Sequence, residues 1–267
     1  MTNTRYTLIA ALVAASALPV GASATEDRSQ GTLQVNSTLR SAYRLGAQYC
    51  PPGSPSTTTE CVQFSGRAGI PGLGQATVSY IKAFDETICP GQVVQQKTSL
   101  IDVAGKGQIK IAMEYPRCAN PAPSSVVIQG TIAEGTGAFA GASGSLQIAS
   151  SVHAATCGTG GCSGAATDTW TGSITVPGLE FDLTPPVFQP VATKVVRAPR
   201  TAKTIRVRYA PKAQDAVDGL VRAKCKPASG SRFKVGRTTR VTCTAEDTSA
   251  NVAAPVSFKV TVKKRRR

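Results

Sequence analysis

The sequence predicts an all-β protein, in which a glycine-rich antiparallel β-barrel or sandwich precedes a second, smaller β domain. Aromatic residues make up 5% and charged residues 17% of the 267 residues, and Gly, Ser, Thr, Ala and Val are abundant, which suits short strands and many turns. Apolar side chains recur with a period of two in many segments. No segment keeps the i, i+3, i+4 spacing of an amphipathic helix over three turns.

The N-terminus has the pattern of a secretory signal. Arg5 precedes an apolar run over residues 6–20, and Ala22, Ser23 and Ala24 have the small-x-small pattern of a signal-peptidase site. We expect residues 1–24 to be removed and the mature protein to be secreted or extracellular, associated with the cell surface. No later run approaches the roughly 20 apolar residues of a membrane span, so no span is expected.

Residues 31–179 are predicted to form the first, disulfide-bonded domain. The alternation is clearest where Ile109, Ile111 and Met113 are separated by single residues. Many antiparallel strands bury one face each only when the sheet closes or two sheets stack, which gives a barrel or a sandwich. Pro185 and Pro186, with the Pro-Gly pair at 177–178, predict a short, semi-rigid connector near 179–186.

A glycine-rich stretch at 130–146 reads G-T-I-A-E-G-T-G-A-F-A-G-A-S-G-S-L. It resembles the G-T-G-x-F-x-G-A-x-G hairpin corner of the small β-barrel in allene oxide cyclase and dirigent proteins, and residues 170–174 (W-T-G-S-I) are similar to their closing strand. The resemblance implies that the glycines allow tight bends and that Phe139 plugs the barrel. No Gly-Lys-Ser/Thr arrangement follows, so a nucleotide-binding loop is not expected.

Residues 182–263 carry several turn and strand motifs in a fixed order. These are an Asp pair at 215 and 218, C-x-P-x-S-G-S-x-F from Cys225, a Gly236–Cys243 strand segment, and D-x-S-x-N from Asp247. The order resembles the HYR (hyalin repeat) module, an immunoglobulin-like β-sandwich of extracellular proteins. The resemblance implies this fold and a Cys225–Cys243 bridge. Ala250 stands where the module usually has a glycine.

Eight cysteines in a chain with an export signal predict disulfides. The six in the first domain allow 15 connectivities. Local pairing is the simplest hypothesis because each pair flanks one turn-rich stretch: Cys50–Cys61, Cys89–Cys118 and Cys157–Cys162. The last pair also suits half a zinc site, but a second Cys or His pair is missing nearby, and a disulfide-closed loop is favoured.

The net charge of +15 is concentrated in the second domain. Residues 183–267 contain 20 Lys or Arg and four acids, while residues 1–182 contain 10 and 11. This asymmetry predicts attraction to an anionic polymer or cell-surface glycan, and the alternative is a basic surface that serves solubility only. Sequence-specific nucleic-acid binding is not expected, because the second domain has few aromatic residues on which bases could stack. A protein partner is a further possibility. We expect the cations of residues 194–208 to form a row on one sheet face, with the basic tail at 264–267 nearby. The candidate polyanion-binding residues are Lys194, Arg197, Arg200, Lys203, Arg206, Arg208, Lys263, Lys264, Arg265, Arg266 and Arg267.

Catalysis and cofactors are not expected. The chain has a single histidine, His153, and no Gly-x-Ser-x-Gly nucleophile elbow. His153 and Asp168 could belong to a Ser-His-Asp triad, but no serine of the sequence stands out as its nucleophile. The scattered acids, Asp168 among them, are expected to be solvated. Asp182, Asp215, Asp218 and Asp247 could bring three oxygens to a Ca²⁺ ion at one end of the sandwich. Turns closed by side-chain to backbone hydrogen bonds explain the same residues and are favoured, so no metal is expected.

The sequence therefore predicts a secreted or cell-surface, non-enzymatic adhesion or binding protein, and its abundance of Ala, Gly, Thr and Arg suggests a bacterial source. The alternative is that the first domain binds a small ligand or is an enzymatic barrel, with the second domain as an accessory adhesion domain. A cavity at which Tyr80, Tyr115 or His153 converge would favour that alternative.

Overall fold

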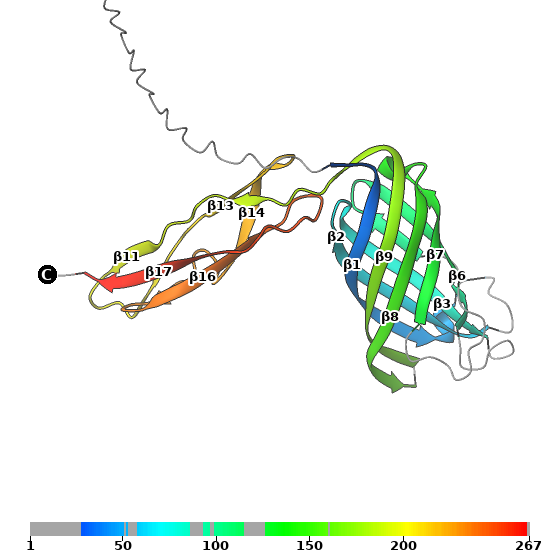
Figure 1. Ribbon diagram of the computed structural model, residues 1–267. Coiled ribbons are helices and arrows are strands. Elements are labelled where there is room, and N and C mark those ends of the chain that lie inside the picture. Colours follow the sequence, from blue (N-terminus) through cyan, green and yellow to red (C-terminus); the bar gives the residue numbers. More distant parts are fainter. Residues whose placement is uncertain are drawn as a thin grey trace, which may run out of the picture.

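The computed structural model describes residues 28–50, 52, 58–85, 93–96, 99–114, 126–159 and 161–265. Over these residues the protein is all-β, as predicted, apart from two short 3-10 turns, η1 (Ala47–Tyr49) and η2 (Gly137–Phe139). An elongated β-sandwich extends sideways from one end of a β-barrel (Figure 1). The predicted signal segment, Cys89, Cys118 and Tyr115 lie outside the described residues.

The first domain is an antiparallel barrel. Among the described residues its sheet has the order β2-β1-β9-β8-β7-β6-β5-β3-β4, and pairing of β2 with β3 closes eight of the strands while β4 stays on the outer edge of β3. The strands are β1 (Arg28–Gly46), β2 (Thr58–Ile70), β3 (Gly74–Asp85), β4 (Val93–Gln96), β5 (Ser99–Val103), β6 (Gly107–Glu114), β7 (Val126–Gly135), β8 (Ser143–Gly158) and β9 (Gly161–Asp182).

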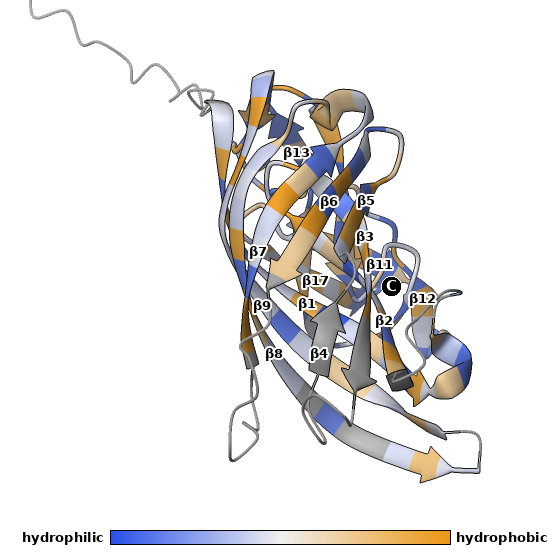
Figure 2. Ribbon diagram, turned by 90° about the vertical axis from the view of Figure 1, so that its right-hand side faces the viewer, coloured by the Kyte–Doolittle hydropathy of each residue, from blue (hydrophilic) through white to orange (hydrophobic). Residues whose placement is uncertain are grey.

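The barrel core follows from the period of two in its strands, because alternate side chains point into the closed sheet. The alternation is visible as bands of apolar and polar residues along the ribbons (Figure 2). Leu33, Ile109 and Ile174 are at most 1% exposed and belong to one core cluster. Phe139 from η2 is buried in the same cluster, which fits the plug that the barrel resemblance implied.

The glycine-rich corner brings β8 close to β9. Gly144 has a φ of +129°, and a Cβ built on it would lie 2.3 Å from the carbonyl oxygen of Ser173. A side chain is therefore excluded both by the backbone conformation and by the neighbouring strand. The close approach of two strands at this point explains why glycine is needed here.

The second domain is a sandwich of a six-stranded and a two-stranded sheet. The larger has the order β10-β13-β14-β16-β17-β11 and the smaller pairs β12 with β15. The strands are β10 (Val187–Phe188), β11 (Lys194–Ala198), β12 (Thr204–Arg206), β13 (Lys212–Asp215), β14 (Gly219–Lys226), β15 (Arg232–Lys234), β16 (Thr238–Ala245) and β17 (Val256–Lys264). The core includes Val207, Phe233, Val241, Phe258 and Val260.

The two domains contact each other directly. The backbone N–H of Gly72, in the turn between β2 and β3, donates to the Ser249 carbonyl oxygen at 2.8 Å, and Gln75 donates a side-chain hydrogen bond to Glu246. The connector is shorter than predicted, because β9 continues through the Pro-Gly pair at 177–178 to Asp182.

The D-x-S-x-N turn keeps the backbone geometry expected of the module although Ala250 stands in the usual glycine position. Ala250 has a φ of 63°, in the left-handed region that a glycine would adopt more easily.

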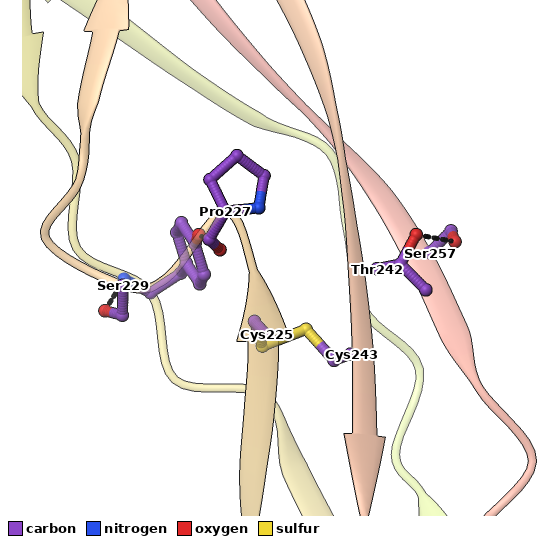
Figure 3. Close-up of a disulfide and its surroundings, with 7 residues drawn as sticks. Cys225, Pro227, Ser229, Thr242, Cys243 and Ser257 are labelled. Carbon is purple, nitrogen blue, oxygen red and sulfur yellow. Dashed lines mark hydrogen bonds between the residues drawn. A yellow bond between two sulfur atoms is a disulfide. The ribbon is translucent and has the colours of Figure 1, made fainter. Parts of the chain in front are cut away.

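Three disulfides are present among the described residues: Cys50–Cys61 and Cys157–Cys162, as local pairing predicted, and Cys225–Cys243, as the HYR resemblance implied. Cys225 on β14 lies directly opposite Cys243 on β16, and the bridge crosses between these neighbouring strands (Figure 3). On the next strand pair, the Thr242 and Ser257 hydroxyls form a hydrogen bond at 3.0 Å. Cys243 is fully buried, so the bridge belongs to the core of the sandwich.

Candidate functional site: the basic sheet face

The outer face of the six-stranded sheet is lined with cations. Strands β14, β16 and β17 direct one set of alternate residues to the core and the other to solvent. The exposed set contains eight basic side chains from five neighbouring strands, which we call the basic face: Arg197, Lys212, Arg222, Lys224, Lys226, Arg240, Lys259 and Lys263. The other outward strand positions of this face are uncharged, among them Thr242, Thr244 and Ser257.

The strand register places like charges directly opposite each other. Lys212 faces Arg222, Arg240 faces Lys259, and Arg197 faces Lys263. In the two antiparallel pairs, Lys212–Arg222 and Arg240–Lys259, the Cβ atoms are about 4.5–5.5 Å apart, and like charges at that separation destabilise a sheet. Arg197 and Lys263 lie side by side on parallel strands. A bound polyanion would remove this repulsion.

The four acids of the sandwich lie elsewhere, at the end that meets the barrel. Asp215 ends β13, Asp218 follows in the turn to β14, and Glu246 and Asp247 follow β16. Asp218 accepts hydrogen bonds from the backbone N–H and the hydroxyl of Thr248. The acids therefore form turns and domain contacts, and none of these four side chains lies among the cations of the basic face.

The residues predicted from the sequence divide between two sheets. Arg197 and Lys263 lie on the basic face, whereas Arg206 lies on β12, opposite Arg232 of β15 in the smaller sheet. The ammonium of Lys194 donates to the Arg208 carbonyl oxygen at 2.7 Å. The expectation of one row over residues 194–208 is therefore wrong, because β11 and β12 belong to different sheets.

The remaining predicted cations surround these positions. Arg200 and Lys203 are exposed in the connection between β11 and β12, and Lys264 and Arg265 are exposed at the end of β17. The end of β17 lies at the end of the sandwich that is farthest from the barrel (Figure 1). Arg266 and Arg267 lie outside the described residues.

Most residues of the basic face are not among those predicted from the sequence. Its central members are Lys212, Arg222, Lys224, Lys226, Arg240 and Lys259. A signal was present, because Arg222, Lys224 and Lys226 alternate with Val221, Ala223 and Cys225 along one strand. What the sequence does not give is the register that places Arg240 and Lys259 on the same surface.

A groove of about 810 Å³ borders the basic face along β14. Lys212, Arg222 and Lys224 line it together with Tyr209. The Tyr209 ring packs edge-on against Phe258 at a centroid distance of 5.2 Å, its hydroxyl donates to the Pro227 carbonyl oxygen, and burial raises its pKa. The groove thus has a fixed aromatic wall beside three cations.

The barrel interior holds a second group of polar side chains. Asp168 is fully buried and accepts hydrogen bonds from Tyr80 (2.8 Å) and Ser150. The expectation that Asp168 is solvated is therefore wrong, because its position on β9 points into the barrel. His153 is exposed on β8, so the two residues do not form the Ser-His-Asp arrangement considered above.

The comparison with known families assigns the second domain. Residues 181–262 match the HYR domain family. This match agrees with the resemblance found in the motifs, and HYR domains are extracellular adhesion-type modules. No curated protein and no solved structure matches the chain. The described residues contain no helix with the length and hydrophobicity that a membrane-spanning helix requires.

Proposed function

We propose that the protein is a secreted, non-enzymatic binding protein whose HYR domain holds anionic polymers on the basic face. The observation that carries the proposal is the set of eight exposed cations on one sheet face, three pairs of which are directly opposed. Such an arrangement costs stability in the free protein and favours a partner that supplies negative charge.

The geometry suits a polymer better than a single small anion. Neighbouring strands are about 4.8 Å apart and alternate residues of one strand about 6.6 Å apart, so the cations form a two-dimensional array. An array of this kind makes many weak contacts with phosphate, sulfate or carboxylate groups. Each contact releases a counterion from the polymer, so affinity falls steeply with salt and depends little on polymer sequence.

Three matched double variants test the location of the site. Arg240→Gln/Lys259→Gln removes one opposed pair from the basic face, Arg206→Gln/Arg232→Gln removes one from the smaller sheet, and Arg40→Gln/Arg67→Gln removes one from the outer wall of the barrel. The mature chain is applied to immobilised heparin, teichoic acid and DNA at about 50 mM salt. We expect the first variant to lose most retention and the barrel variant to behave as wild type. Equal loss in all three would mean that only net charge matters.

A second candidate function is small-ligand binding inside the barrel. Beside the Asp168 group, the buried side-chain atoms Ser37 Oγ, Ser41 Oγ and Trp170 Nε1 have no hydrogen-bond partner among the described residues. A polar ligand or ordered water would satisfy them. Trp170 is the single tryptophan of the chain and is 3% exposed, so its fluorescence reports on the barrel interior. Titration with a panel of small polar and apolar ligands should shift its emission if the interior binds one, and unchanged emission across the panel would remove this function.

A further inference from the structure

Three buried carboxylates converge at the joint between the two domains. Asp182 ends β9, Asp215 ends β13, and Asp247 begins the turn that follows β16. One carboxylate oxygen of each lies within 4.8 Å of the other two, and the three residues are 8%, 3% and 7% exposed. Elements distant in sequence thus bring three anionic groups to one buried point.

The hydrogen bonds at this point fix the carboxylates but leave an oxygen of Asp215 unused. Asp215 Oδ1 accepts from the backbone N–H groups of Val217 and Asp218, each at 2.8 Å. Asp215 Oδ2 is buried and has no hydrogen-bond partner among the described residues. A buried carboxylate oxygen without a partner costs free energy, and a cation would remove that cost.

We infer that Asp182, Asp215 and Asp247 bind a calcium ion at the joint. The donors are carboxylate oxygens, which are hard ligands that suit Ca²⁺ or Mg²⁺ and not softer metals. Three protein carboxylates favour Ca²⁺, which takes six to eight oxygens with flexible geometry, over Mg²⁺, which keeps several waters and uses one or two carboxylates. The turn hydrogen bonds expected from the sequence are present as well. Asp182 and Asp215 accept them through Oδ1, and Asp247 accepts from Asn251 through both oxygens, each of which keeps a second lone pair for an ion.

The position of the ion gives it a structural role. Asp182 is the last residue of the final barrel strand, while Asp215 and Asp247 belong to the body of the sandwich. Asn251 already links these parts, since its side-chain amide donates to the Asp182 carbonyl oxygen at 2.9 Å and to Asp247 Oδ2 at 2.8 Å. A calcium ion would join the barrel strand to both turns and hold the HYR domain in a fixed orientation on the barrel.

Calorimetric titration of the chelator-treated full chain with CaCl₂ tests the site. We expect one Ca²⁺ per chain with a dissociation constant of about 10⁻³ M or tighter, the range of extracellular calcium sites, and weaker binding of Mg²⁺. Asp215→Asn keeps an oxygen for the two backbone N–H groups but loses the negative charge, and it should weaken calcium binding at least tenfold. The control Asp102→Asn removes an exposed carboxylate on β5 and should leave the calcium affinity unchanged. Absence of binding at about 5 mM CaCl₂ in the wild type, or equal affinity in the Asp215 variant, would overturn the proposal.

A measurement on the wild type keeps the test independent of how the variant folds. Hydrogen exchange with and without CaCl₂ should show added protection in the segments 213–219 and 246–252. Little change is expected in residues 161–167, which lie at the opposite end of β9 from Asp182. Protection spread evenly over the chain, or none, would contradict a site at Asp182, Asp215 and Asp247.

Discussion

Loss of the Cys225–Cys243 bridge should destabilise the HYR domain by about 3 kcal/mol. The bridge spans 18 residues, for which the loop-closure relation gives an entropy of about 11 cal/mol/K, or about 3 kcal/mol at 25 °C. The variant is Cys225→Ala/Cys243→Ala. Because Cys243 is fully buried, the lost sulfur adds a small packing cost to the entropic effect.

Hydrogen exchange measured by peptide separates the effect on each domain. A loss of about 3 kcal/mol should speed globally exchanging amides of β14, β16 and β17 by roughly 100-fold, since 1.4 kcal/mol is tenfold. Trp170 fluorescence should report an unchanged barrel in the same variant. As a control, Cys157→Ala/Cys162→Ala opens a loop with a separation of only five residues and should cost about 2 kcal/mol, in the barrel alone. Unchanged exchange in β14 and β16 would show that the register holds this sheet without the bridge, and the reasoning would fail.

Three further outcomes are expected. Gly144→Ala should destabilise the barrel by about 1–3 kcal/mol, because the Cβ of the alanine would meet the Ser173 carbonyl oxygen. The free energy of unfolding is measured in denaturant with Trp170 fluorescence. Gly178→Ala, where a Cβ would meet no atom within 4 Å, should destabilise the barrel less, and an equal destabilisation would refute the clash. Burial raises the pKa of Asp247 above its ordinary value of 3.8; hydrogen bonds from Asn251 lower this pKa in part, and the charges of Asp182 and Asp215 raise it by smaller amounts. In calcium-free buffer the stabilising contribution of the protonated carboxyl should therefore be present below pH 3.8 and lost as pH rises through the folded-state pKa, and Asp247→Asn should abolish that part of the pH profile of the denaturation midpoint. His153→Ala should leave DNA binding and folding unchanged, because the side chain is exposed and outside the basic face; a loss of either would reopen a role for it.

The strands were predictable because burial of one sheet face makes apolar and polar residues alternate along each strand. Ile109, Ile111 and the alternation around Cys225 indicate strands without knowledge of their partners. Phe139 and the Cys225–Cys243 bridge followed from family resemblance, not from periodicity. The connector was predicted too long because a Pro-Gly pair usually ends a strand, whereas β9 accommodates Pro177 and Gly178 and continues to Asp182.

The site was harder to predict because it depends on which strands become neighbours. Arg240 and Lys259 are 19 positions apart in sequence and meet only through the register of β16 with β17. Arg206 seemed to belong with Arg197 because both lie in one short segment, but the chain crosses from one sheet to the other between them. Asp168 was expected at the surface because carboxylates rarely lie inside, and its burial depends on Tyr80 and Ser150 from other strands.

The central claim is that the basic face binds polyanions by charge, and the salt dependence of binding tests it most directly. The affinity of the mature chain for a short duplex DNA is measured between about 50 and 200 mM NaCl, for the wild type and for Arg240→Gln/Lys259→Gln. Several contacts should give a slope of log K against log salt of about −3 or steeper, and the variant should lower its magnitude by about 2, since each contact contributes about 0.9. A wild-type slope shallower than about −1, or the same slope in the variant, would contradict the account.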